Sequence, residues 1–194
     1  MAERIVLVNG LPGSGKTTLA GLLGKALGVP VIGKDALKEA LYVPGVVPEQ
    51  LGRLASDVMW RLAAITPGTA VLESWWFKPR DLAYAEAGWR CCGEPDLIEV
   101  WCDVPPVVAR DRVLARSRPD TVYQDAQRLA TAWDDWAEHA EPLEIGGVVR
   151  VDTTAGVHMG DLVRVLTARR GVATCPESEP SSDSAGPDRR TTEI

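Results

Sequence analysis

A glycine-rich segment near the start of the chain has the residue types and spacing of a phosphate-binding loop. Gly10, Gly15, Lys16 and Thr17 satisfy the pattern G-x-x-x-x-G-K-[ST]. Glycines allow successive backbone N–H groups to face one phosphate, the lysine adds positive charge beside the β and γ phosphates, and the threonine hydroxyl is a magnesium ligand. The segment therefore predicts binding of ATP with Mg²⁺ by Gly10, Leu11, Pro12, Gly13, Ser14, Gly15, Lys16, Thr17 and Thr18.

Asp35, in the segment Val31–Glu39, is the candidate general base. A carboxylate that contacts an acceptor hydroxyl both orients the hydroxyl and receives its proton. The alternative is that Asp35 caps a helix predicted over residues 36–42. Lys38 stands where a capping box would place Glu or Gln, so the box is incomplete. Lys34 either contacts substrate or is solvated.

Three further candidates follow a strand predicted over residues 69–73. Ligands of open α/β sheets gather outside the carboxyl ends of the strands. We therefore expect Glu73 to hold a magnesium-bound water or the acceptor hydroxyl, unless it is only a polar strand end. Trp75 and Trp76 are predicted to stack on a ring or sugar face of the acceptor, with core packing as the alternative.

Several arginines lie on a helix predicted over residues 106–115 and on the polar loop 116–120. Arg116 and Arg118, in the loop, suit stabilisation of the charge on a migrating phosphoryl group. Arg112 is assigned to the nucleotide phosphates, whereas Arg110 faces outward. The alternative for each is an ordinary exposed arginine.

The elements that must position these residues alternate between strands and helices. Residues 5–8 form a continuous apolar run typical of a strand buried on both faces. Further strands are predicted over residues 29–32, 69–73, 97–102 and 148–151, the first of them at an edge because of Pro30. Helices are predicted over 16–27, 36–42, 48–65, 81–89, 106–115, 122–139 and 160–169. This order indicates a parallel sheet with helices on both faces.

The whole-chain composition fits one α/β domain over residues 1–171. Residues 172–194 are rich in serine, proline and acids and are predicted to be a disordered tail. The net charge of −6, without a basic cluster, argues against a nucleic-acid partner. The four cysteines are expected to be reduced thiols. With no apolar stretch of about 18 residues and no signal peptide, we expect a cytoplasmic protein without a membrane partner.

The chain resembles small P-loop kinases of the chloramphenicol phosphotransferase-like and zeta-toxin-like groups. The resemblance lies in Val31–Glu39, in Val71–Ser74, and in Asp103-Val104-Pro105 followed by the arginines. A guanine-reading [NT]KxD motif is absent. The resemblance implies a three-layer P-loop kinase fold with strand order 2-3-1-4-5. It also implies that Asp35 takes the proton of the acceptor hydroxyl.

Departures from related groups leave the acceptor open. Residues 73–76 read Glu-Ser-Trp-Trp where polynucleotide kinases tend to have DxTN, and Gly33 replaces the first of two aspartates of shikimate kinases. We expect an ATP-dependent phosphotransferase that modifies a hydroxyl of a small molecule similar to an antibiotic, sugar or nucleoside. The alternatives are a nucleoside or polynucleotide 5′-hydroxyl kinase and an ATP-binding regulatory module without an acceptor. The oligomeric state is not predicted.

Overall fold

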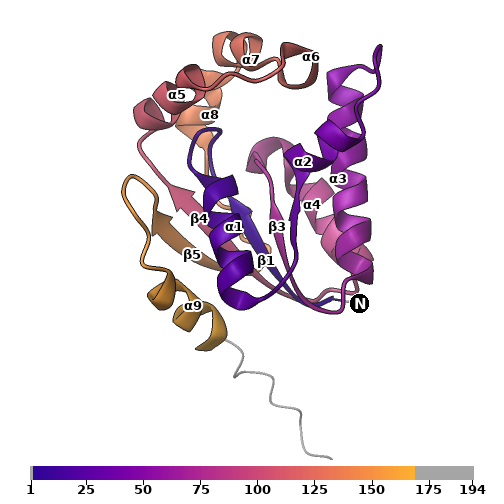
Figure 1. The fold of residues 1–194 in the computed structure, drawn as a ribbon, viewed down its shortest axis with the longest axis vertical. Helices are drawn as coiled ribbons and strands as arrows, with labels where there is room; N and C mark the ends of the chain where they lie inside the picture. The colour runs from indigo at the N-terminus through magenta and orange to yellow at the C-terminus, as the bar shows by residue number, and fades with distance from the viewer. Residues whose placement is uncertain (1, 169–194) are drawn as a thin grey trace, which may run out of the picture.

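The computed structural model describes residues 2–168, so the predicted tail lies outside the described residues. Its centre is a five-stranded parallel sheet in the order β2-β3-β1-β4-β5 (Figure 1), which confirms the predicted topology. The strands are β1 (Ala2–Asn9), β2 (Val31–Gly33), β3 (Gly68–Glu73), β4 (Asp96–Asp103) and β5 (Gly147–Asp152).

The helices of the described residues fall into two groups, those that cover the sheet and those beyond its carboxyl edge. The first group is α1 (Lys16–Leu27), α2 (Lys34–Ala40), α3 (Pro48–Ile65), α4 (Lys78–Cys91) and α9 (Met159–Ala168). The second group is α5 (Pro106–Ala115), α6 (Asp120–Tyr123), α7 (Asp125–Thr131) and α8 (Trp133–His139). None of the helices in residues 2–168 is both long and apolar enough to cross a bilayer.

The central strand β1 is buried on both faces because its side chains alternate between two apolar layers. Ile5 and Leu7 point into a core shared with α3 and α4, whereas Val6 and Val8 point into a core shared with α1 and α9. All four side chains are at most 1% exposed. The sheet is therefore a rigid platform, and its carboxyl edge can hold side chains in fixed positions.

The helices α5 to α8 arch over that carboxyl edge (Figure 1), and we call residues 106–139 the lid. The lid is attached on both sides of the edge. Trp133 and Trp136 of α8 pack with Leu11 of the glycine-rich loop, and Val122 of α6 packs with Leu51 of α3. The lid thus covers the region where the sequence places the reactive side chains.

The prediction of a single helix over residues 122–139 is wrong. The segment instead contains α6, α7 and α8, separated at Gln124 and Ala132. Gln124 has φ of 53°, in the left-handed region, and Ala132 has φ of −128°, so neither can continue an α-helix. The two breaks fold the lid back over the sheet edge.

Other boundaries shift by a few residues. The strand predicted over residues 29–32 is β2 at 31–33, and it is an edge strand as expected. The helix predicted over 36–42 is α2 at 34–40, and α4 begins three residues before the predicted position. The shift of α2 matters for the site because it places Asp35 inside the first helical turn.

Candidate active site

The glycine-rich loop joins β1 to α1 and takes a backbone course that requires glycine. Gly10 and Gly13 have φ of 144° and 84°. A Cβ added at Gly13 would lie 2.1 Å from the carbonyl oxygen of Ala109, and one at Gly10 would lie 2.8 Å from the carbonyl oxygen of Cys102. Side chains at these positions would collide with backbone, so the loop can lie close against β4 and α5 only with glycine there.

Lys16 and the start of α1 give the loop its positive potential. The Lys16 side chain is buried, and its Nζ donates a hydrogen bond of 2.9 Å to the carbonyl oxygen of Leu11. Burial lowers the pKa of Lys16, while the carboxylates of Glu73 and Asp35 act in the opposite direction. No acidic residue stands in the first turn of α1. The N-terminal amides of the helix are therefore free to attract an anion.

Asn9 holds the entrance of this loop, a role that sequence reasoning missed. Its side chain is fully buried at the end of β1. Its Oδ1 accepts hydrogen bonds from the backbone N–H groups of Gly10 (2.8 Å) and Trp76 (2.9 Å). Its Nδ2 donates to Oε1 of the fully buried Glu99 at 2.9 Å. A polar residue ending an apolar buried strand was the signal that could have revealed it.

Thr17 and Glu73 lie together, as the magnesium prediction requires. The Thr17 hydroxyl donates to Oε1 of Glu73 at 3.3 Å, and Glu73 is 5% exposed at the end of β3. Burial raises the pKa of Glu73, and the neighbouring Lys16 opposes that rise. Residues 2–168 contain no cluster of three or more acidic, His or Cys side chains that could hold a metal alone. One hydroxyl and one carboxylate fit a magnesium ion that takes its other ligands from phosphates and water.

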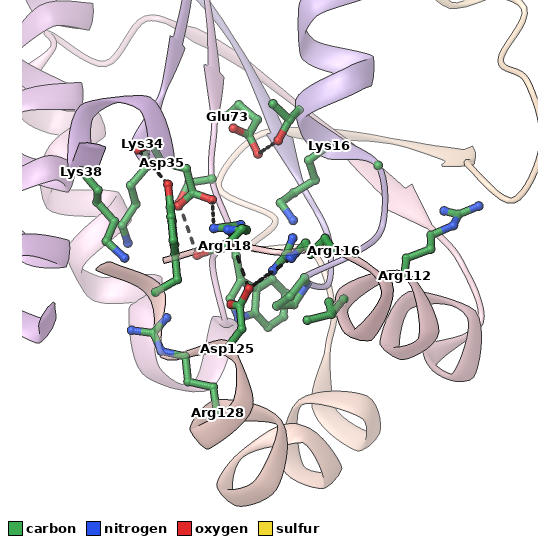
Figure 2. A pocket seen from close by; sticks show the side chains of 18 of the residues that line it. Lys16, Lys34, Asp35, Lys38, Glu73, Arg112, Arg116, Arg118, Asp125 and Arg128 are labelled. Atoms are coloured by element: carbon green, nitrogen blue, oxygen red, sulfur yellow. Dashed lines mark hydrogen bonds and ion pairs between the residues drawn. The ribbon is translucent and has the colours of Figure 1, made fainter. Parts of the chain in front are cut away.

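Asp35 is the second residue of α2, and it does not cap that helix. The N-cap residue is Gly33, and no side-chain hydrogen bond caps the helix. The Asp35 carboxylate instead accepts a hydrogen bond of 2.7 Å from Nη2 of Arg118, which lies in the lid (Figure 2). The capping hypothesis for Asp35 is therefore wrong, and its carboxylate lies in the region between α2 and the lid.

The three lid arginines of interest all line the same cavity but have different partners. The guanidinium of Arg112 donates to the carbonyl oxygens of Thr153 and Thr154, in the loop after β5, at 3.1–3.2 Å. Arg116 pairs with Asp125 at 3.1 Å, whereas Arg118 pairs with Asp35 at 2.7 Å and also lies 3.7 Å from Asp125. Arg112 thus links the lid to the β5 loop, and Arg118 links it to α2.

The two tryptophans that were predicted to contact an acceptor separate in the structure. Trp75 is half-buried and lines the cavity. Trp76 is only 1% exposed and does not line it, and its ring packs against those of Trp60 (6.1 Å between centroids) and Tyr84 (6.0 Å). Trp76 is therefore a core residue, because the chain turns after β3 and sends successive side chains to opposite sides. The prediction of acceptor contact is not supported for Trp76.

The cavity between the glycine-rich loop, α2 and the lid has a volume of about 330 Å³ and a strong positive character. Eight cationic side chains line it: Lys16, Lys34, Lys38, Arg80, Arg112, Arg116, Arg118 and Arg128. Three carboxylates, those of Asp35, Glu73 and Asp125, face them. The chain as a whole carries −6, so the positive charge is concentrated here. Nucleotide phosphates and other anions are the ligands that such a cavity favours.

Lys38, Arg128 and Tyr123 are cavity residues that the sequence did not single out. Lys38 follows Lys34 by four residues, so the two share one face of α2, and this spacing was an available signal. Arg128 and Tyr123 had no such signal, because their placement depends on the breaks in the lid at Gln124 and Ala132.

A family model described as an AAA domain, AAA_33, matches residues 5–143. This match spans the loop, Asp35, Glu73 and the lid, and it covers more than half of the chain. The chain belongs to the AAA_33 family. An uncharacterised protein of Mycobacterium tuberculosis is 27% identical to it over 152 residues, which is 69% of this chain and 30% of that protein. The chain thus spans about 30% of the length of this curated relative.

Solved structures similar to this AAA_33 domain share its fold. A candidate kinase from Chloroflexus aurantiacus has a TM-score of 0.66 at 22% identity and covers 84% of this chain and 96% of its own. The tunicamycin resistance protein of Deinococcus radiodurans has a TM-score of 0.53 at 19% identity (87% and 96% covered). A shikimate kinase from Bacteroides thetaiotaomicron has 0.52 at 16% (86% and 97%). The chain has the fold of the small P-loop kinases, as the sequence predicted.

Proposed function

We propose that this protein transfers the γ-phosphoryl group of ATP to a hydroxyl group of a small molecule. The observation that carries the proposal is the position of Asp35, which lines one cavity together with the loop residues Lys16 and Thr17. ATP binding alone does not require a carboxylate in this cavity, whereas phosphoryl transfer to a hydroxyl uses one. A carboxylate in this position can orient an acceptor hydroxyl and receive its proton.

The loop side of the cavity would bind the nucleotide. The glycine-rich backbone and the α1 amides would hold the β and γ phosphates, and Lys16 would stabilise the charge on them. Thr17 and Glu73 are the residues that would hold Mg²⁺, with Glu73 acting directly or through a water molecule. When bound, the magnesium ion would neutralise part of the phosphate charge. On the lid, Arg112 and Arg116 would contact the same phosphates after leaving their present partners, the carbonyl oxygens of Thr153 and Thr154 and the carboxylate of Asp125.

The acceptor hydroxyl would enter beside Asp35. In the transfer step the hydroxyl oxygen forms a bond to the γ-phosphorus, the bond from that phosphorus to the β–γ bridging oxygen breaks, and ADP leaves. The hydroxyl proton passes to the Asp35 carboxylate. Asp35 is paired with Arg118 in this structure, so the acceptor must displace or share this arginine. Arg118, once displaced, would help stabilise the transferring group.

The lid supports transfer to an acceptor over transfer to water. It lies over the cavity and is anchored by apolar contacts at both ends: Trp133 and Trp136 pack against the glycine-rich loop, and Val122 packs against α3. Exclusion of water from a closed site suppresses hydrolysis of ATP. The acceptor must fit under the lid, which favours a small molecule over a polynucleotide.

The test is a screen for ADP formation over sugars, nucleosides, antibiotics, hydroxy acids and short oligonucleotides, with each product identified by mass. We expect a phosphoester of at least one small hydroxyl compound. Asp35→Asn should lower the transfer rate by about 10²–10⁴-fold and leave ATP binding intact. Asp134→Asn, at an exposed position in the first turn of α8, is the matched control and should be neutral. Unchanged turnover in Asp35→Asn would favour an ATPase or a regulatory module instead.

A further inference from the structure

Three cationic side chains line the cavity on the side of Asp35 away from the glycine-rich loop. Lys34 and Lys38 belong to α2, and Arg128 belongs to α7 of the lid. Figure 2 shows Lys34, Lys38 and Arg128 on one side of the cavity and Lys16 and Arg112 on the other. Among the side chains that the structure describes, none of Lys34, Lys38 and Arg128 forms an ion pair with a carboxylate.

Lys38 is the least expected of the three because it is almost completely buried. Lys38 is 3% exposed, and its Nζ lies 4.7 Å from the centre of the Tyr123 ring. Burial lowers the pKa of Lys38 to about 8; the Asp35 carboxylate, the largest charge effect, opposes this lowering, whereas Arg128, Lys34 and Arg118 add to it. A buried ammonium without a carboxylate partner is unfavourable. Its position is better explained by an anionic ligand than by the packing of α2.

Lys34 and Arg128 extend the same positive surface. Lys34 lies one helical turn before Lys38, with its Nζ 5.3 Å from the centre of the Trp76 ring. Burial also lowers the pKa of Lys34; the carboxylates of Asp81 and Asp35 oppose this lowering, whereas Arg80 and Arg128 add to it. The ammonium groups of Lys34 and Lys38 each lie over an aromatic ring, whereas Arg128 belongs to the lid. Two separate elements of the fold bring their cations to one region.

The nucleotide does not account for these cations. The phosphates of ATP would lie on the loop, where Lys16 and the α1 amides are available to them. The region of Lys34, Lys38 and Arg128 lies beyond Asp35, where the acceptor must lie for its hydroxyl to reach both Asp35 and the γ-phosphate. The positive charge in this region is therefore available to bind the acceptor.

We infer that the acceptor carries an anionic group, a phosphate or a carboxylate, in addition to the hydroxyl that is phosphorylated, and that Lys34, Lys38 and Arg128 bind this group. The inference rests on the proposed function and specifies its acceptor class. The ammonium groups of the two lysines neutralise the anion from α2, and the guanidinium of Arg128 closes over it from the lid. Neutral sugars and uncharged nucleosides are poor acceptors on this account.

The binding test uses the full chain saturated with Mg²⁺ and a non-hydrolysable ATP analogue, so that the loop is occupied. Inorganic phosphate and acetate, the two simplest probes, are then titrated by calorimetry. We expect one further anion site. The probe that binds it more tightly shows whether the site prefers a phosphate or a carboxylate. Lys38→Met and Arg128→Met should each weaken it by about tenfold or more. Lys25→Met, an exposed lysine of α1, is the matched control. Absence of the site, or a site that Lys38→Met leaves unchanged, overturns the inference.

The kinetic test compares acceptors that share a three-carbon skeleton and differ in whether one end carries an anionic group: glycerol, glycerol 3-phosphate and glycerate. We expect a higher kcat/KM for a charged member, and Lys38→Met should raise the KM for that acceptor by about tenfold without changing the KM for ATP. Preference for glycerol, or an equal effect on the KM for ATP, overturns the inference and leaves the kinase proposal standing. An intact second anion site in a protein that phosphorylates no hydroxyl compound contradicts the kinase proposal, and with it the assignment of this site to an acceptor, while the anion site itself stands.

Discussion

Replacement of Lys38 by methionine should make the protein more stable, although it removes a charge that the acceptor needs. Met keeps the length and most of the volume of Lys, so the packing of α2 is preserved. In the folded protein the pKa of Lys38 falls from 10.5 to about 8, a shift of about 2.5. Each unit corresponds to about 1.4 kcal/mol, so burial of the ammonium destabilises the fold by about 3 kcal/mol below pH 8.

One favourable contact of Lys38 opposes this gain. The interaction of its ammonium with the Tyr123 ring is lost in the variant, at a cost of about 1 kcal/mol. The net gain in the free energy of unfolding is therefore about 2 kcal/mol at pH 7. In a chain of this length, this raises the midpoint of thermal unfolding by roughly 4–8 °C.

The pH dependence separates this mechanism from improved packing. Between pH 8 and 10.5 the unfolded state holds a proton on Lys38 that the folded state has lost, so the stability of the wild-type protein rises with pH in this window. The variant lacks this rise, and the difference between the two proteins shrinks as pH increases. Urea unfolding at pH 7 and pH 9.5 measures it, with Lys25→Met as control. A variant less stable than wild type, or a difference independent of pH, would refute the reasoning.

Three further predictions concern the helix packing, the metal and the acceptor. Gly88→Ala should lower the free energy of unfolding by about 1–3 kcal/mol, because the added Cβ would lie 2.5 Å from the Trp60 ring. Gly21→Ala, whose Cβ would have no atom within 4 Å, should raise the free energy of unfolding by about 0.5–1 kcal/mol. Urea unfolding measures both variants, and equal shifts would contradict the packing of α4 on α3. Glu73→Gln should raise the Mg²⁺ concentration for half-maximal turnover by about 10–100-fold, as seen in a magnesium titration of ADP formation, and an unchanged titration would remove Glu73 from the metal site. For a charged acceptor, kcat/KM should fall as pH rises through about 8, where Lys38 loses its proton, and a profile that stays flat to pH 9.5 would argue against a role for Lys38.

The sequence was most informative where one residue type is required by the backbone or by the chemistry. The glycines and Lys16 of the loop identify the phosphate site without knowledge of the rest of the fold, because few other arrangements use them together. The strand order was available only through the resemblance to small P-loop kinases, since periodicity gives strands but not their neighbours. The role of Asp35 was predicted in the same way, and the structure adds its partner Arg118.

The parts that sequence analysis missed depend on the tertiary path of the lid. No apolar period reveals that Gln124 takes a left-handed conformation, yet this break turns Arg128 toward the cavity. Trp76 was misassigned because adjacent residues after a strand point to opposite sides, and only the core around Trp60 decides which one is buried. The net charge of −6, from which we predicted that a nucleic-acid partner is unlikely, gave no sign of a cavity lined mainly by cations.

The partition of the γ-phosphoryl group between an acceptor and water tests the central claim most directly. Phosphorus NMR of a reaction with ATP, Mg²⁺ and a charged hydroxyl compound measures both products at once, for the wild-type protein and for Asp35→Asn. The account predicts that the wild-type protein forms the phosphoester in near equivalence to ADP, and that Asp35→Asn loses the phosphoester while it still binds ATP. Inorganic phosphate as the sole product in both proteins, at equal rates, would contradict it.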